Sequence, residues 1–250
     1  MAVRSVRSLY PCIPETLVSN PAPDAVSVLL VGASGLVGQG VLQACLASDR
    51  VARIVSLVRT EGTTPWRDAT PAGRVEEYVL PDFGDAARHA AAFGGLQACF
   101  YCAGAPPVGT AQAEYHRVTV ELTLAVARAY ADANPQGRFL YVSGANADAR
   151  SRVMPLRVKG EAEQALAALP LQSVMLRPGG VRPVSGTGTR HGLLKPLYAF
   201  GGPAMKLAGR LAPQWVTDNR AIGQAMIALA CEPRPPAVVE CAGIATWAQR

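Results

Sequence analysis

Apolar residues along the chain follow two alternating patterns. Short continuous runs rich in valine, isoleucine and leucine are typical of strands buried on both faces of a parallel sheet. They alternate with longer segments in which apolar residues recur every three or four positions, as on one face of a helix. The predicted strands cover residues 26–31, 51–59, 75–83, 98–104, 138–143 and 171–177, with 238–241 as a candidate last strand, and the predicted helices begin at Leu36 and cover 85–93, 112–133, 155–166 and 218–231.

This alternation predicts the fold class and the domain organisation. Strands and helices that follow one another in this way give an α/β fold with a doubly wound parallel sheet. The 250 residues are enough for one substantial core. We expect an irregular N-terminal extension over residues 1–24, which hold four prolines, and one domain over residues 25–250. Within that domain, residues 181–216 have several glycines and prolines and few strand patterns, and are expected to form a small C-terminal lobe.

Three evenly spaced glycines, Gly32, Gly35 and Gly38, follow the first predicted strand. A strand, a glycine turn and a helix in this order are typical of a nucleotide-binding crossover. Gly32 allows a tight turn, Gly35 lets the backbone approach a pyrophosphate, and Gly38 lets helix and strand pack closely. The helix start offers free N–H groups and the positive end of its dipole to phosphates. The alternative is that the glycines serve only the turn itself.

The Gly-x-x-Gly-x-x-Gly spacing resembles that of the extended and atypical short-chain dehydrogenase/reductases, which include sugar-nucleotide epimerases and NAD(P)H-binding regulators. The run Leu156–Glu161 is similar to the Tat-interacting-protein-like branch, in which Tyr-x-x-x-Lys precedes Gly-Glu. With Ser143 and Arg177-Pro-Gly, these motifs cover most of residues 26–180. The resemblance implies an NAD(P)-binding Rossmann fold in which residues 181–216 form the segment that covers the substrate.

The second predicted strand ends at Arg59, where proteins of this kind hold the adenosine ribose. An NAD-preferring protein places Asp or Glu there, whereas Arg59 is a permanent cation that can grip a 2′-phosphate. NADP(H) is therefore the expected cofactor and NAD(H) the second choice; the alternative is an ordinary solvated arginine. The resemblance implies cofactor contacts from Gly32, Ser34, Gly35, Leu36, Val37 and Gly38 at the turn, from Asp82, Phe83, Cys102, Ala103 and Gly104 after later strands, and from Lys159, Arg177, Pro178 and Gly179.

The resemblance also implies a catalytic group. In the family, a serine or threonine after the fifth strand binds the substrate carbonyl, a tyrosine supplies the proton, and a lysine holds the nicotinamide ribose and lowers the tyrosine pKa. Ser143 and Lys159 match this pattern, but Pro155 stands at the tyrosine position and carries no proton. The candidate substitutes are Tyr141, which shares a strand face with Ser143, a water held by Ser143, and His191 or Tyr198 in the lobe.

Two classes of function follow from these residues. The first is an NADP(H)-dependent oxidoreductase that acts on an unknown small carbonyl or alcohol substrate with a degenerate active site. The second is a catalytically inactive protein whose nucleotide occupancy controls a partner. The cofactor motifs are common to both classes and do not separate them. We expect a monomer or a homodimer.

The composition limits which classes of partner and which cellular location are expected. The formal charge is +6, but the basic residues are scattered singly and no run of them lies beside aromatic residues, so no nucleic-acid partner is expected. No apolar run approaches membrane-spanning length, and residues 1–10 lack the hydrophobic region of a secretory signal. The six cysteines are expected to be buried thiols, and Cys99 and Cys102 lack the further ligands of a metal site. These features predict a cytoplasmic protein with no metal.

Overall fold

A seven-stranded sheet forms the centre of the computed structural model, which describes residues 20–188 and 215–250. The strand order is β3-β2-β1-β4-β5-β6-β9, and every neighbouring pair is parallel. The order reverses between β1 and β4, and ligands of such sheets bind at that point, beyond the carboxyl ends of the strands. The predicted doubly wound sheet is thus confirmed. Its strands are β1 (Val26–Val31), β2 (Val51–Val58), β3 (Val75–Val79), β4 (Ala98–Tyr101), β5 (Arg138–Val142), β6 (Gln172–Arg177) and β9 (Val238–Glu240).

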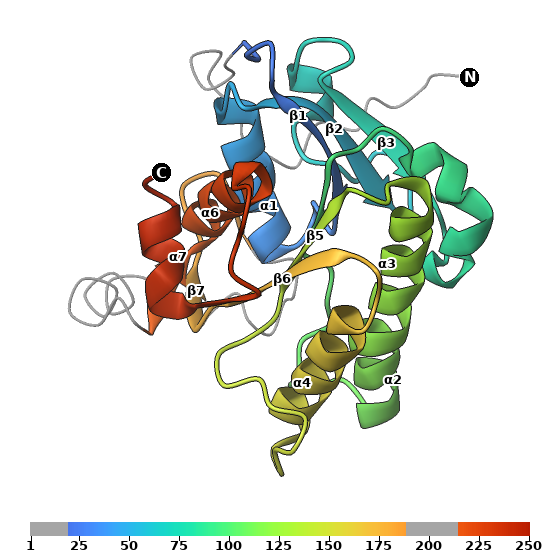
Figure 1. Ribbon diagram of the computed structural model, residues 1–250, viewed down its shortest axis with the longest axis vertical. Coiled ribbons are helices and arrows are strands. Elements are labelled where there is room, and N and C mark those ends of the chain that lie inside the picture. Colours follow the sequence, from blue (N-terminus) through green and yellow to red (C-terminus); the bar gives the residue numbers. More distant parts are fainter. Residues whose placement is uncertain (1–19, 189–214) are drawn as a thin grey trace, which may run out of the picture.

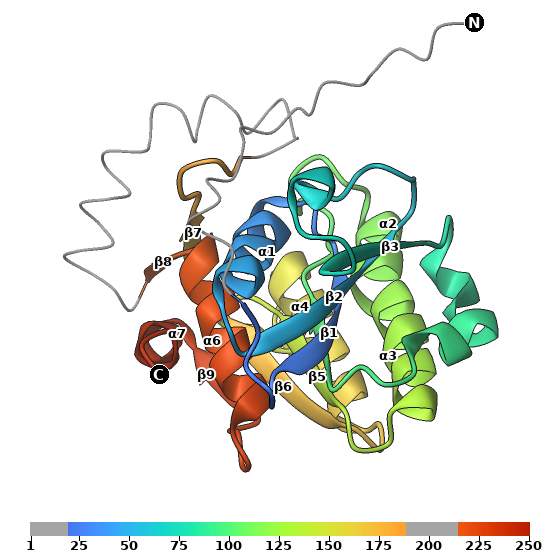
Figure 2. The same ribbon diagram turned by 90° about the horizontal axis from the view of Figure 1, so that it is seen from above.

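Helices cover both faces of the sheet (Figures 1 and 2). One face packs against α1 (Leu36–Ala47), α6 (Asn219–Cys231) and α7 (Cys241–Trp247). The other packs against η3 (Phe83–Phe93), α2 (Gln112–His116), α3 (Leu122–Ala133) and α4 (Met154–Ala167). Because alternate residues of each strand point to opposite faces, Val28 and Leu30 enter the first core and Leu29 and Val31 the second. Burial on both faces explains the continuous apolar runs.

Small residues let α1 and α6 pack closely. A Cβ atom added at Gly223 of α6 would lie 2.7 Å from the Cβ of Ala44, and one added at Gly40 would lie 2.4 Å from Asn219. Asn219 is fully buried, and its amide donates a hydrogen bond of 2.7 Å to the carbonyl of Leu36. The first turn of α1 is therefore held from the side by α6.

The predicted helix over residues 112–133 is not continuous. The structure has α2, then a π-helical turn η4 (Arg117–Glu121), then α3. The Thr123 hydroxyl donates a hydrogen bond of 2.8 Å to the carbonyl of Thr119, which lies within the π turn. Such turns insert one residue into a helix and are frequent at functional sites.

Other boundaries also differ from the prediction. The third strand ends at Val79 because Asp82 caps the following helix, accepting 2.8 Å from the Gly84 N–H. The ends of the 181–216 segment form a parallel strand pair, β7 (Gly180–Arg182) and β8 (Val216–Asp218), where few strands were expected. Helix α7 and the 3-10 turn η2 (Arg67–Ala69) were not predicted.

Cys45, Cys99, Cys102 and Cys231 are free thiols. Cys45, Cys99 and Cys241 are buried, and Cys102 and Cys231 are partly buried. Over residues 20–188 and 215–250, no three His, Cys, Asp or Glu side chains gather as metal ligands. In the same ranges, no helix has the length and apolar character needed to span a membrane.

Candidate functional site

The glycine turn lies at the carboxyl edge of the sheet, between β1 and α1. Gly32 has a φ of +87°, a conformation that L residues rarely adopt, and its carbonyl accepts 3.0 Å from the Gly35 N–H. A Cβ atom at Gly38 would lie 2.0 Å from that carbonyl oxygen, and one at Gly32 would lie 2.6 Å from the nitrogen of Ala103. Gly32 and Gly38 are therefore required by the close approach of β1, α1 and the end of β4.

The start of α1 fits a pyrophosphate. Gly35 is its exposed N-cap, no side chain caps the helix, and no acidic residue lies in its first turn. The backbone N–H groups beyond Gly35, at Leu36 and Val37, and the positive end of the helix dipole are thus available to an anion. The Ser34 carbonyl accepts 3.0 Å from the buried amide of Gln39, which fixes the turn from behind.

Arg59 follows β2 at the same edge and is exposed. Its guanidinium makes no ion pair with any part of the chain that the structure describes. An arginine in this state keeps its donors for a ligand, which agrees with the predicted 2′-phosphate contact. That contact stays a prediction.

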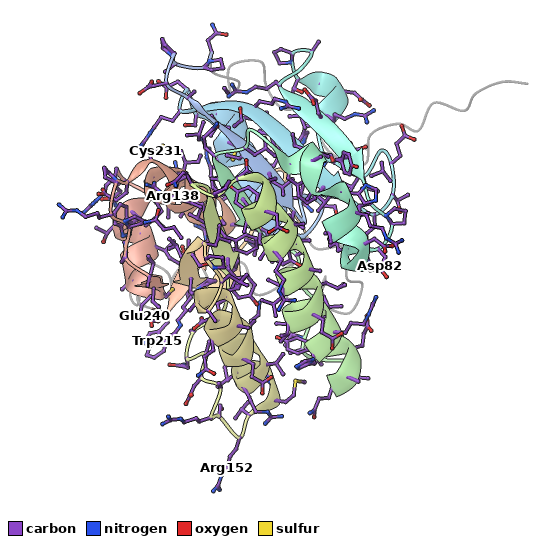
Figure 3. All side chains as sticks on the ribbon, turned by 45° about the vertical axis from the view of Figure 1, so that its right-hand side comes forward. Asp82, Arg138, Arg152, Trp215, Cys231 and Glu240 are labelled. Atoms are coloured by element: carbon purple, nitrogen blue, oxygen red, sulfur yellow. The ribbon has the colours of Figure 1, made fainter. Side chains whose placement is uncertain are left out.

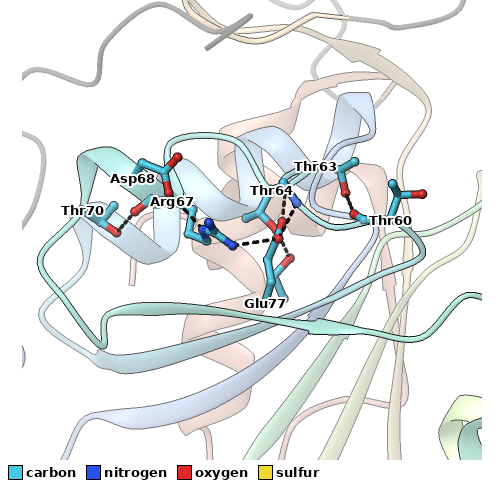
Figure 4. A network of polar contacts seen from close by, with 9 residues as sticks. Thr60, Thr63, Thr64, Arg67, Asp68, Thr70 and Glu77 are labelled. Atoms are coloured by element: carbon cyan, nitrogen blue, oxygen red, sulfur yellow. Dashed lines mark hydrogen bonds and ion pairs between the residues drawn. The ribbon is translucent and has the colours of Figure 1, made fainter. Parts of the chain in front are cut away.

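The loop after Arg59 is organised by one buried carboxylate (Figure 4). Glu77 accepts hydrogen bonds from the N–H of Gly62 at 2.7 Å and of Thr64 at 2.6 Å, and from Arg67 at 3.0 Å. Burial alone raises the pKa of Glu77, but these hydrogen bonds and the Arg67 charge together hold that pKa below its usual value. The loop is therefore fixed at both sides of Thr63, close in sequence to Arg59.

The next predicted cofactor residues lie after β3 and β4. Asp82 is exposed and forms an ion pair of 3.0 Å with Arg117, whereas the Phe83 ring is buried in the core, so only its backbone is left for a ligand. Cys102, whose N–H donates 2.8 Å to Val31, leads into Ala103 and Gly104 beside the glycine turn.

The structure brings two of the three predicted catalytic residues, Lys159 and Tyr141, into contact at the end of β5, and Ser143 follows that strand in the chain. The Lys159 Nζ atom donates a hydrogen bond of 3.1 Å to the Tyr141 hydroxyl and one of 3.0 Å to the carbonyl of Val142. It lies 4.7 Å from the centre of the Tyr141 ring. Ser143 follows directly after β5, and its buried hydroxyl has no hydrogen-bond partner within the described residues. A buried hydroxyl without a partner is costly unless a ligand or water completes it.

Burial shifts the acidity of this group. It lowers the pKa of Lys159 to about 8, against the opposing effect of the nearby Glu163 carboxylate. It raises the pKa of Tyr141 well above its ordinary value. Near neutral pH, Lys159 can therefore gain or lose a proton, whereas Tyr141 stays protonated.

Pro155 is the second residue of α4, one turn before Lys159, as predicted from the sequence. Tyr141, one of the proposed substitutes for the missing tyrosine, is fully buried, and its hydroxyl bonds to Lys159. The two other residues proposed as substitutes, His191 and Tyr198, lie outside the described residues.

The Arg177 guanidinium forms ion pairs with carboxylates of the protein itself. It pairs with the buried Glu163, at 2.5 and 3.0 Å, and with Glu240 at 2.9 Å. The predicted neighbours make backbone contacts: the Pro178 carbonyl accepts 2.8 Å from Ala145, and a Cβ atom at Gly179 would lie 2.2 Å from the carbonyl of Trp215. In Figure 3, Glu240 and Trp215 lie on the side of the molecule opposite Asp82.

Sequence reasoning missed two polar residues around the site. Glu163 lies four residues after Lys159, a spacing that puts both on one face of α4. Gln39 is buried and joins Ser34 to Gly188. The Gly188 carbonyl accepts a hydrogen bond of 2.9 Å from the Gln39 side-chain amide, and the Gly188 N–H donates one of 2.9 Å to the Gln39 side-chain oxygen. The available signals were the helical spacing for Glu163 and a polar residue on the apolar face of α1 for Gln39.

The curated relatives are fungal proteins. The chain is 26% identical over 212 residues to "Protein fmp52, mitochondrial" of Emericella nidulans, covering 80% of this chain and 85% of the relative. It is 28% identical over 208 residues to "Protein fmp52-1, mitochondrial" of Aspergillus terreus, with the same shares. Because these relatives are named as mitochondrial, the expectation of a cytoplasmic location is wrong by this comparison.

Solved structures share the fold. The Bordetella bronchiseptica enzyme WbmF in complex with NAD+ matches with a TM-score of 0.61 at 15% identity, over 90% of this chain and 78% of that one. A short-chain dehydrogenase from Burkholderia cenocepacia J2315 in complex with NADP matches with a TM-score of 0.58 at 18% identity, over 86% and 88%. The fold is that of nicotinamide-dinucleotide-binding Rossmann proteins, and ligands of such folds bind beyond the carboxyl ends of the strands.

A family model decides membership. The model of the NAD dependent epimerase/dehydratase family matches residues 28–159, which run from β1 through the glycine turn to Lys159. The matched range is more than half of the chain and holds the glycine turn, Ser143 and Lys159 together. The chain therefore belongs to the NAD dependent epimerase/dehydratase family.

Proposed function

We propose that the chain is an NADP(H)-dependent oxidoreductase that acts on a small carbonyl or alcohol substrate. The observation that carries the proposal is the group at the end of β5, where Lys159 is held by Tyr141 and by Val142, the residue directly before Ser143 with its unpartnered hydroxyl. When bound, the nicotinamide supplies or accepts the hydride. The glycine turn and the start of α1 would hold its phosphates, and Arg59 favours the 2′-phosphorylated form.

The chain's own residues would handle the proton. Ser143 offers a buried hydroxyl to the substrate oxygen. Lys159 has a pKa of about 8 and can donate a proton near neutral pH, where general acids work best. Tyr141 is a positioning residue in this scheme, because it is fully buried behind the Lys159 ammonium and holds it in place.

A second function is favoured by Pro155, which removes the family proton donor from the first turn of α4. In this case the chain would bind the nucleotide and respond to it without turnover, as a sensing or regulatory protein. Loss of a general acid typically removes about two to four orders of magnitude in rate. The two functions thus differ in turnover and agree in binding.

A measurement of NADPH turnover distinguishes the oxidoreductase from the sensing protein. We expect measurable NADPH affinity and slow NADPH consumption over a panel of aldehydes and ketones. Pro155→Tyr places a phenol one helical turn before Lys159 and should raise this rate by about tenfold or more. Pro155→Phe, which adds the ring without the hydroxyl, is the matched control and should not raise it.

One result would contradict the oxidoreductase, and another would contradict the role given to the phenol. If neither the wild type nor Pro155→Tyr consumes NADPH although both bind it, the sensing function is favoured. If Pro155→Phe accelerates the reaction as much as Pro155→Tyr, the gain comes from helix geometry and not from a proton.

A further inference from the structure

Two side-chain amides lie buried behind the glycine turn. Gln39 of α1 is 1% exposed, and Asn219, the first residue of α6, is fully buried. Burying a polar side chain costs free energy unless each of its donors and acceptors finds a partner. The partners of these two amides therefore show which parts of the backbone they hold.

Gln39 connects the glycine turn to the segment that follows β7. Its side-chain nitrogen donates a hydrogen bond of 3.0 Å to the Ser34 carbonyl and one of 2.9 Å to the Gly188 carbonyl. Its side-chain oxygen accepts a hydrogen bond of 2.9 Å from the Gly188 N–H. An amide has two N–H donors and one acceptor oxygen, so every polar atom of Gln39 is used.

Asn219 makes the same kind of bridge from α6. Its side-chain nitrogen donates a hydrogen bond of 2.7 Å to the Leu36 carbonyl and one of 2.9 Å to the Thr187 hydroxyl. Its side-chain oxygen accepts a hydrogen bond of 3.1 Å from the Val184 N–H. The two amides thus join the start of α1 to residues 184–188 at several points.

The peptide between Ser34 and Gly35 is held at both of its polar atoms. Its N–H donates a hydrogen bond of 3.0 Å to the Gly32 carbonyl, and its carbonyl accepts one from the buried Gln39 amide. The carbonyl, which carries a partial negative charge, therefore faces the interior of the molecule. This orientation keeps that charge away from the start of α1, where an anion would bind.

We infer that Gln39 is a positioning residue for the diphosphate of the nucleotide. The inference rests on the proposed nucleotide binding and adds to it a residue outside the three glycines of the turn. Without the Gln39 amide, the Ser34 carbonyl would lose its buried partner and could turn toward the ligand. A turn that is already fixed in its binding shape also loses less conformational freedom when the ligand binds.

The first test is a titration of Gln39→Leu, a substitution of similar size that removes the amide. Binding of NADPH and NADH, followed by nicotinamide fluorescence, should weaken by about tenfold for each nucleotide, because both carry the diphosphate. Adenosine 2′-monophosphate has no 5′-phosphate, so calorimetry should find its affinity unchanged. A defect of the fold would weaken the binding of all three ligands.

Gln43→Leu is the matched control. Gln43 lies one turn further along α1, and its side-chain amide donates a hydrogen bond of 3.3 Å to the Ser185 carbonyl, in the same segment that Gln39 contacts. The substitution removes a bridge to that segment and leaves the Ser34 carbonyl held. It should leave the binding of all three ligands unchanged. A loss equal to that of Gln39→Leu would assign the effect to the segment and overturn the inference.

A second measurement needs no variant and decides the matter if Gln39→Leu does not fold. The side-chain amide signals of Gln39 and Gln43 in the wild type are compared by heteronuclear NMR during a titration with NADPH. The Gln39 signal should shift, because the carbonyl that it binds belongs to the turn, and the Gln43 signal should hardly move. A Gln39 signal that stays in place at saturation would overturn the inference.

The outcomes separate this inference from the proposed function. Equal NADPH affinity of the wild type and a folded Gln39→Leu protein would refute the positioning role and leave the oxidoreductase standing. Binding that depends on Gln39 without NADPH consumption would refute the oxidoreductase and leave the positioning role standing. A wild type that binds neither nucleotide would refute both.

Discussion

Arg59 is the residue on which the choice of nucleotide depends in the proposed function. It is exposed at the end of β2 and has no ion-pair partner in the described ranges, so its donors are available. The loop that follows it is fixed by the buried Glu77. An exposed arginine beside a fixed loop can select a phosphate without any rearrangement of the fold.

Arg59→Ala should weaken NADPH binding by about tenfold to a hundredfold, since a hydrogen bond to a charged group contributes about 1.5–3 kcal/mol. NADH binding should barely change, because NADH has no 2′-phosphate. Titration by nicotinamide fluorescence measures both. Arg128→Ala, which removes an exposed arginine from α3, is the matched control and should affect neither. Equal losses for both nucleotides would show that Arg59 supports the fold only.

At this scale, sequence motifs located Ser143, Lys159 and Pro155 because each has a fixed offset from a strand or helix end. The contact between Lys159 and Tyr141 could not be predicted in the same way. It depends on how far α4 lies from β5 and on the direction of a long, flexible side chain. The use of Arg177 in ion pairs with Glu163 and Glu240 was hidden for the same reason: its partners come from distant segments.

The glycine turn is the element that determines binding in the proposed function, and its glycines differ in what they tolerate. Gly35 has a φ of −78°, which any residue can adopt, and a Cβ atom there would lie 3.3 Å from the carbonyl oxygen of Gly32. This is a tight contact that a small shift relieves. A Cβ atom at Gly38 has no such room.

Gly35→Val should therefore leave a folded protein and reduce NADPH binding by more than about tenfold, because the side chain lies where the pyrophosphate approaches. Circular dichroism and a fluorescence titration test the two halves of this statement. Gly38→Val should instead lose the folded state. Unchanged binding by a folded Gly35→Val protein would mean that the turn does not cradle the phosphates.

Elements were predicted from sequence better than their interruptions. Continuous apolar runs identified the central strands β1, β2, β4 and β5, since burial on both faces leaves a strong pattern. The edge strands β3 and β9 are only partly buried and show it less clearly. The π turn at Arg117–Glu121 left no such pattern, because one inserted residue keeps apolar residues on the helix face on either side. The short pair β7 and β8 was missed because three-residue strands carry too few positions to show alternation.

The stability of the whole molecule should depend on the proton of Lys159. The unfolded chain keeps this proton up to an ordinary pKa of 10.5, but the folded chain only up to about 8. Below pH 8, both states are charged and the folded state carries the full cost of burying the charge. Between about pH 8 and pH 10.5 the folded state loses the proton first, so that cost declines as the pH rises.

The free energy of unfolding of Lys159→Met relative to the wild type should fall by about 1–3 kcal/mol between pH 7 and pH 9.5, because only the wild type is relieved of a buried charge over this range. Lys159→Arg keeps its charge throughout and should retain the cost at both pH values. Urea unfolding at pH 7 and pH 9.5 measures these differences. If the difference in unfolding free energy between Lys159→Met and the wild type were the same at both pH values, the pKa of Lys159 would not be lowered in the folded state.

The π turn also affects how this chain can be compared with its relatives. His116 and Glu121 are five residues apart and lie 3.2 Å from each other, a separation that an unbroken α-helix does not bring together. Deleting one residue of the turn would restore a regular helix, but it would rotate everything before it by about 100° around the axis. Tyr115, now buried, would then face another direction. A relative that lacks the inserted residue therefore corresponds to this chain in one register before the turn and in another after it.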